Sequence, residues 1–396
     1  MADQVPHICF IAPNAYPLLA GTADIQVIGG AELQQVIVAR LLASRGIRVS
    51  MVCLDFGQAD QVTIDGIEVI RAYKPNEGLP VVRFIWPRLS RIWKCLQRAN
   101  ADVYYQRAAG KLTGVMVAFC RRYRKKSIFA AAGNPDLIPN TPRIRFARDR
   151  WIYSYGLKHV DRIFVQNGEQ AQFCNTHFSR ECTLVPNCYV LPHDRVASRT
   201  GEFVLWVSTI RKLKRPELFL SIAEALPHVR FRMIGGPSPG EEALFESVKS
   251  QARSLKNLEF LGFVPYARAE SEFDRATLFI NTSESEGFPN TFLQAWARCV
   301  PTVSFIDAGA RLNGEDVGFR VRSMDEMVKL IGELVSSESR RESEGKRCLT
   351  YFEGCHSSDH ILDLYEQEIR ELLEVPDFER ERHVDRKNIT TSEPDR

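Results

Sequence analysis

A short acidic loop, residues 283–291, is the first part of the chain whose residue types suit chemistry. It has the sequence SESEGFPNT and lies between a predicted strand over 276–280 and a predicted helix over 292–298. The free N–H groups and the dipole at the start of a helix suit a diphosphate, and Glu286 can accept hydrogen bonds from sugar hydroxyls. A capping loop with solvated acids is the alternative, and the loop alone leaves both interpretations open.

A basic turn, residues 211–215, carries the opposite charge. Its sequence RKLKR has four cations in five residues and connects a predicted strand over 203–209 to a predicted helix over 216–226. Cations at the carboxyl end of a strand can neutralise phosphate charge in a partly dry site. We select Arg211 and Lys214 for this role, with a solvated basic turn as the alternative.

A glycine pair, Gly29 and Gly30, ends a long loop over 13–30 and precedes a predicted helix over 31–44. Paired glycines let a ligand approach the backbone closely, and the length of the loop suggests a function beyond connection. A simple turn is the alternative. Neither this pair nor Gly235–Gly236 belongs to a GxGxxG fingerprint or a Walker loop.

Two series of alternating strands and helices must position these residues. The first predicts strands over 7–12, 48–54, 101–106, 127–132 and 162–166. The second alternates more clearly and predicts strands over 203–209, 229–236, 258–264, 276–283 and 301–307, with helices over 216–226 and 241–255. Because ligands of open parallel sheets bind beyond the strand carboxyl ends, we predict an α/β fold with two Rossmann-like domains facing a central cleft.

Length and composition agree with two domains. The 396 residues exceed the roughly 250 that a single core usually supports. We predict an N-terminal domain over 1–195, a C-terminal domain over 196–374 whose last helices can pack back on the first domain, and a disordered tail over 375–396. Ten cysteines without CxxC pairs indicate reduced thiols and no metal site. The N-terminus has no signal-peptide pattern, so we expect a cytoplasmic protein.

A basic run over 81–126 dominates the charge pattern, with twelve Lys or Arg residues against one acid, Asp102. Its first part interleaves arginines with Trp86 and Trp93, which suits the interface of an anionic membrane. A buried apolar face with solvated arginines is about as well supported. Nucleic-acid binding is less favoured, because no nucleic-acid module accompanies the run.

Taken together, these motifs resemble glycosyltransferase family 4, whose members are retaining enzymes with the GT-B fold. The resemblance covers residues 7–370 and is strongest over 203–304. It implies that Glu286 is the first glutamate of the family's E-x7-E motif and contacts the donor sugar. It places the donor along Gly287, Phe288, Asn290 and Thr291, and near the glycine pair. Lys214 matches the family's phosphate-binding lysine.

Three positions depart from the family pattern. Gln294 replaces the second glutamate, which normally holds the ribose, and its amide can accept a hydroxyl bond only without charge. The usual arginine partner of the lysine aligns with Thr209, so Arg211 must substitute for it. The N-terminal domain lacks the expected histidine, and Asn134 and Asp136 are the residues that could orient the acceptor.

From the resemblance we predict a retaining, metal-independent, hexosyltransferase-type enzyme without a cofactor. It would move a sugar from a UDP- or GDP-sugar held by the C-terminal domain to a glycan or lipid-linked saccharide on the N-terminal domain. Cell-surface polysaccharide biosynthesis at the inner face of the cell membrane is the expected setting. A noncatalytic sugar-nucleotide-binding or partner-stabilising protein on the same fold is the main alternative, and a nucleotide-sugar epimerase is a third.

Overall fold

The first domain is built on an eight-stranded sheet. The computed structural model describes residues 5–22, 29–78, 84–191 and 201–374, so the predicted domain boundary at 195 and the tail over 375–396 lie outside the described residues. The strand order is β3-β4-β2-β1-β5-β6-β7-β8, and every neighbouring pair is parallel except β3 with β4. The strands are β1 (His7–Ile11), β2 (Arg48–Cys53), β3 (Gln61–Ile64), β4 (Ile67–Arg71), β5 (Val103–Arg107), β6 (Lys126–Ala130), β7 (Arg162–Val165) and β8 (Thr183–Leu184).

Helices cover both faces of this sheet, which explains its continuous apolar strands. Successive residues of β1 alternate between two cores: Cys9 and Ile11 face one, and Ile8 and Phe10 face the other. The helices are α1 (Tyr16–Ala20), α2 (Gly30–Ser44), α3 (Ser90–Ala99), α4 (Lys111–Tyr123), α5 (Ala147–His159) and α6 (Gly168–Phe178), with shorter helical turns over Phe84–Leu89 and Asn134–Leu137.

The second domain repeats the plan with six strands in the order β11-β10-β9-β12-β13-β16. These are β9 (Phe203–Val207), β10 (Phe231–Ile234), β11 (Leu258–Gly262), β12 (Ala276–Asn281), β13 (Thr302–Ser304) and β16 (Phe319–Arg320), and β14 (Arg311–Leu312) pairs separately with β15 (Glu315–Asp316). Its helices are α7 (Pro216–Ala225), α8 (Glu242–Ala252), α9 (Tyr266–Phe273), α10 (Asn290–Trp296) and α11 (Met324–Ser336). The predicted α/β fold with two Rossmann-like domains is confirmed.

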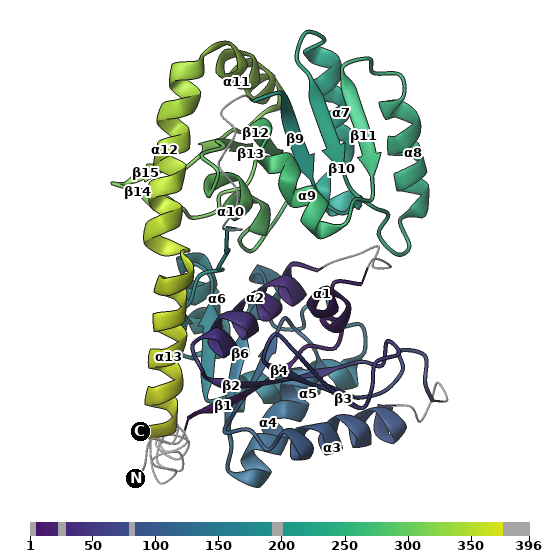
Figure 1. Cartoon of the computed structure of the whole chain (residues 1–396), viewed down its shortest axis with the longest axis vertical. Coiled ribbons are helices and arrows are strands. Elements are labelled where there is room, and N and C mark those ends of the chain that lie inside the picture. Colours follow the sequence, from purple (N-terminus) through teal and green to yellow (C-terminus); the bar gives the residue numbers. More distant parts are fainter. Residues whose placement is uncertain (1–4, 23–28, 79–83, 192–200, 375–396) are drawn as a thin grey trace, which may run out of the picture.

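Two long C-terminal helices run along both domains (Figure 1). Helix α12 (Glu338–Cys355) packs Cys348 and Phe352 into the second domain. Helix α13 (Ser358–Glu374) packs against the first domain, where the Tyr365 hydroxyl lies 3.1 Å from that of Tyr105. The chain therefore returns to the first domain after completing the second.

Strand order also locates a candidate site. In the first sheet, successive strands are added on one side of β1 up to β4, and from β5 onward on its other side. In the second sheet the strand order reverses in the same way between β9 and β12. Ligands of doubly wound sheets bind at such switch points, beyond the carboxyl ends of the strands. The basic turn follows β9 and the acidic loop follows β12, so the fold brings the two charged motifs together.

Candidate active site

The acidic loop and the basic turn are joined by their backbones. The Glu284 amide donates to the Leu213 carbonyl over 2.9 Å, and the Thr282 hydroxyl donates to the Lys214 carbonyl over 2.7 Å. Thr282 in turn accepts from the indole of Trp206 on β9. These bonds fix the two loops relative to each other and to the sheet beneath them.

At the centre of the site, Lys214 forms an ion pair with Glu286. The Ser283 hydroxyl donates to the same Glu286 oxygen over 2.7 Å. Both side chains are largely buried, with exposed fractions of 12% for Lys214 and 14% for Glu286. Burial lowers the pKa of Lys214 from its ordinary value, the neighbouring Glu286 opposes that shift, and Arg211 adds to it. The pair thus offers a cation for phosphate and an anion for sugar hydroxyls.

The two flanking arginines differ in their surroundings. The Nε of Arg211 is buried and has no hydrogen-bond partner among the described residues. A buried donor without a partner raises the free energy of the folded protein. An anionic ligand that accepts a hydrogen bond from this Nε would remove that cost. Arg215, which the sequence analysis did not select, donates from Nε to the Thr282 carbonyl and from Nη2 to the Ser283 carbonyl. These two hydrogen bonds fix the backbone at the start of the acidic loop.

Gly287 touches the other domain. A Cβ added at Gly287 would lie 2.6 Å from the Ala132 carbonyl oxygen and 2.9 Å from the Cα of Gly133, so only glycine allows this approach. Asn167 donates to the Gly287 carbonyl over 3.4 Å. Phe288 is buried, and its ring centroid lies 4.6 Å from that of His356, between α12 and α13. Contacts between the domains therefore begin inside the acidic loop.

Asn290 connects the two domains with both ends of its amide. Its Nδ2 donates to the Gly30 carbonyl over 3.1 Å, and its Oδ1 accepts from Gln34 on α2 and from Asn187. Arg107, at the end of β5, donates to Asn187 over 2.6 Å. Sequence reasoning missed Gln34, Asn187 and Arg107, because no local pattern marks them. Gly29 caps α2 and sits against Glu32 of the same helix.

Gln294 lies behind the site on α10 and is 5% exposed. Its Nε2 donates to the hydroxyl of Tyr266 over 3.4 Å, and its backbone carbonyl accepts from Arg298. Burial keeps the pKa of Tyr266 well above its ordinary value, so this hydroxyl stays neutral. The predicted ribose contact of Gln294 stays a prediction, as does the donor contact of the partly exposed Thr291.

The two residues predicted to lie on the acceptor side, Asn134 and Asp136, occupy one loop after β6. The carboxylate of Asp136 is fully buried and accepts from the Ala132 amide over 2.7 Å and from Arg143 over 2.9 Å. It holds the loop that meets Gly287. Asn134 Oδ1 is buried without a hydrogen-bond partner among the described residues, so of the two side chains it is the one with an unused polar atom.

Family models match both domains. Residues 28–191 match a model described as "Glycosyltransferase Family 4", and residues 201–337 match one described as "Glycosyl transferases group 1". The O-antigen biosynthesis glycosyltransferase WbnH of Escherichia coli is 35% identical over 98 residues, which cover 25% of this chain and 27% of that protein. The D-inositol 3-phosphate glycosyltransferase of Mycobacterium sp. (strain KMS) is 28% identical over 158 residues, covering 35% and 36%. The matches thus span about a quarter to a third of these relatives.

Solved structures resemble nearly the whole chain. Sucrose-phosphate synthase from Thermosynechococcus elongatus aligns with a TM-score of 0.73 at 15% identity, covering 93% of this chain and 99% of that one. Anabaena HepE, solved in complex with UDP and glucose, aligns with a TM-score of 0.67 at 14% identity, covering 92% and 100%. At these identities the likeness establishes a shared two-domain fold.

Proposed function

Because the chain belongs to glycosyltransferase family 4, we propose that it transfers a hexose, with retention and without a metal, from a UDP- or GDP-sugar to a glycan or lipid-linked saccharide. The buried Lys214–Glu286 pair at the β9–β12 switch point carries this proposal, since it combines a phosphate-binding cation with a hydroxyl-binding carboxylate. The proposed setting is cell-surface polysaccharide synthesis at the inner face of the cell membrane. The O-antigen biosynthesis named for the relative WbnH supports the polysaccharide part of this setting. No described helix is long and apolar enough to cross a membrane.

In the proposed reaction the bond between the sugar's anomeric carbon and the diphosphate breaks while the acceptor oxygen bonds to that carbon on the same face. The acceptor's proton passes to an oxygen of the leaving diphosphate, so no side-chain base is needed. Lys214 and Arg211 stabilise the negative charge that grows on the diphosphate. Glu286 orients the donor sugar through its hydroxyls, and Asn134 lies on the acceptor side.

Replacing Glu286 with Gln tests the proposal. The variant keeps the shape of the side chain but loses its charge, so we expect transfer to fall about 100-fold in kcat/KM. The thermal midpoint should also fall, because the largely buried Lys214 loses its charged partner, but the variant should still fold. Glu284→Gln is the matched control, because its side chain lies exposed two residues away and only its backbone is bonded to the basic turn. Equal activity in both variants would contradict the assignment of Glu286.

The donor, the metal requirement and the stereochemistry need separate measurements. A thermal-shift screen of UDP, GDP and their sugar conjugates identifies the base, since a ligand of the native state raises its apparent stability. Transfer should persist in excess chelator, and NMR of the first product should show the donor's anomeric configuration. Loss of transfer in chelator, or an inverted product, would contradict those parts of the proposal.

A noncatalytic sugar-nucleotide-binding protein is the second candidate. Gln294 supports it, because an uncharged amide that already contacts Tyr266 replaces a ribose-binding carboxylate. This candidate predicts a nucleotide-dependent thermal shift with neither sugar transfer nor donor hydrolysis. A Gln294→Glu variant that gains nucleotide affinity but no turnover would favour it over the enzyme.

A further inference from the structure

Two aromatic side chains at α5 in the first domain are highly exposed to solvent. Trp151 is 72% exposed and Phe146 is 59% exposed, the highest values for large hydrophobic side chains among the described residues. Phe146 is the N-cap residue of α5, and Trp151 lies five residues further on. The residues of α5 that face the protein interior are Asp149, Tyr153, Gly156 and Leu157. At 100° per residue, Trp151 points away from that buried face.

The exposed side of α5 continues as a row of rings. Trp151 stacks on Tyr155 with centroids 6.4 Å apart and planes 21° apart, and Tyr155 lies 4.7 Å from His159. Residues four apart lie on one side of a helix, so these rings form a strip along α5. We call this strip, with Phe146 and the arginines between 143 and 150, the α5 face.

The α5 face is strongly cationic. Residues 143–151 contain four arginines, at 143, 145, 148 and 150, and one acid, Asp149, so their net charge is +3, of which Arg143 is paired with Asp136 outside this stretch. Asp149 is 8% exposed and is paired with Lys111 and Arg148, so it offers little negative charge to a partner. At the far end of the strip, Arg121 contacts His159 over 2.9 Å.

We propose that the α5 face binds an anionic lipid bilayer. Phe146 and Trp151 would enter the interface between head groups and acyl chains, where amphipathic rings are favoured, and the arginines would pair with anionic head groups. A second copy of the chain is a poorer occupant, because a two-fold contact would bring two identical positive faces together. An anionic bilayer offers both an interface for the aromatic rings and negative head groups for the arginines.

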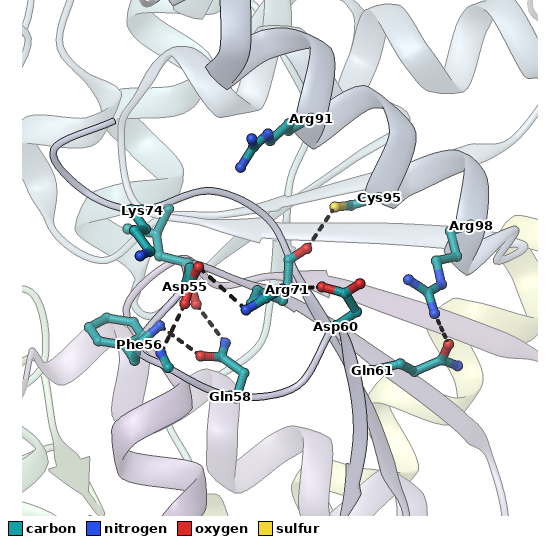
Figure 2. A network of polar contacts seen from close by, with 12 residues as sticks. Asp55, Phe56, Gln58, Asp60, Gln61, Arg71, Lys74, Arg91, Cys95 and Arg98 are labelled. Carbon is teal, nitrogen blue, oxygen red and sulfur yellow. Dashed lines mark hydrogen bonds and ion pairs between the residues drawn. The ribbon is translucent and has the colours of Figure 1, made fainter. Parts of the chain in front are cut away.

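The basic run over 81–126 is less suited to this role where its side chains are described. Ile92 is buried, and Trp93 packs against Phe119 at 5.2 Å in the domain core. Arg91 pairs with Glu77. Arg98 donates to Gln61 on β3, as Figure 2 shows. The contact predicted for residues 81–83 lies outside the described residues. Ile92 and Trp93 thus agree with the alternative of a buried apolar face, and the membrane contact predicted for residues 81–126 stays a prediction.

The α5 face is joined to the candidate active site by one salt bridge. Arg143, at its start, pairs with Asp136 over 2.9 Å, and Asp136 holds the loop that packs on Gly287. A bilayer on the α5 face would therefore lie beside the acceptor side of the site. Binding itself needs no donor and no turnover, so it can be tested independently of the proposed transfer.

Vesicle co-sedimentation of the full chain tests the proposal. The wild-type chain should sediment with vesicles of phosphatidylcholine and phosphatidylglycerol and remain in solution with phosphatidylcholine alone. Phe146→Ser/Trp151→Ser should weaken binding at least about tenfold. Arg145→Glu/Arg150→Glu should weaken it about fivefold or more for each arginine changed. Phe56→Ser is the control, because Phe56 is 43% exposed but lies beside Asp55 in Figure 2.

The thermal midpoint of each variant shows whether weaker binding comes from unfolding. Exposed side chains contribute little to the free energy of unfolding. All three variants should unfold within a few degrees of wild type. Failure of the wild type to bind anionic vesicles, or equal binding by the Phe146/Trp151 variant, would overturn the proposal. Concentration-dependent dimers in analytical ultracentrifugation that disappear in that variant would assign the face to a second copy instead, and would also overturn it.

Discussion

At the residue scale, the site depends on one pair of opposite charges that neutralise each other before a ligand arrives. Lys214 is largely buried, and without Glu286 its charge would be poorly solvated. A diphosphate would supply a second anion for the same ammonium group, leaving Glu286 available to sugar hydroxyls. The ion pair therefore holds both side chains in place before a ligand binds.

Lys214→Gln should remove the phosphate contact. A hydrogen bond to a charged group contributes about 2–3 kcal/mol, so we expect kcat/KM for the donor to fall roughly 100-fold. Steady-state kinetics with the donor found by thermal shift would measure this loss. Lys212→Gln, an exposed lysine of the same turn, should stay near wild type. A similar loss in both variants would mean that general charge, instead of the buried lysine, carries donor binding.

His356 gives a pH prediction. Its ring donates from Nδ1 to the Asn187 carbonyl over 2.7 Å, and burial lowers its pKa to about 4. In the unfolded chain the His356 ring takes up a proton near pH 6.5, whereas in the folded protein the same ring stays uncharged until about pH 4. The free energy of unfolding must therefore fall as the pH decreases through this window.

His356→Asn should remove that pH dependence, because an asparagine amide can still donate to Asn187 but does not titrate. Between pH 6.5 and 5.0, wild type should lose about 1.5 kcal/mol more unfolding free energy than the variant in urea titrations. His7, whose pKa burial also lowers to about 4, is present in both proteins and cancels. Parallel losses in the two proteins would show that His356 already binds its proton in the folded state at pH 5.0.

At the element scale, α5 is fixed by a close crossing with α4. A Cβ added at Gly114 would lie 2.0 Å from the Ile152 carbonyl oxygen, and one added at Gly156 would lie 2.7 Å from the Gly114 nitrogen. The two glycines let the helix backbones touch, and Lys111 pairs with Asp149 near the start of both helices. This crossing sets the orientation of the α5 face.

Gly114→Ala should destabilise the first domain by about 2–3 kcal/mol, since the backbone oxygen it meets cannot move aside without shifting α5. Urea unfolding followed by circular dichroism would measure the change. Gly168→Ala, at the start of α6 with no atom near its added Cβ, should be neutral or slightly stabilising. A Gly114 variant as stable as this control would mean that the helices can separate at little cost.

The sequence predicts elements and motifs that are local, and it misses contacts between distant segments. Periodicity located β9, β12 and the loop between β12 and α10, because each signal lies within a few residues. The hairpin of β3 and β4 was not predicted, although its Asp65-Gly66 turn, with φ of 50° and 76°, left a signal. The bond from Gln34 to Asn290 joins residues 256 positions apart, so only the folded chain reveals it.

At the scale of the whole molecule, the two charged motifs belong to one domain, and the loop with the proposed acceptor-side residues Asn134 and Asp136 belongs to the other. Asn290 bridges them through Gly30, Gln34 and Asn187. The family resemblance predicts a donor contact for Asn290, whereas its hydrogen bonds in the structure favour a role in holding the domains together. Affinity for nucleotide and domain arrangement can be measured separately, so the two roles can be distinguished.

Asn290→Ala should loosen the domains and leave nucleotide binding nearly intact. Three hydrogen bonds at about 1 kcal/mol each are lost, so the closed arrangement becomes less populated and kcat should fall at least tenfold. Small-angle scattering should show a larger radius of gyration, while the nucleotide Kd should change less than about twofold. Asn257→Ala is the matched control, because its amide makes three bonds inside the second domain and should lower stability without opening the molecule. A tenfold weaker nucleotide Kd with an unchanged radius of gyration would instead assign Asn290 to the donor.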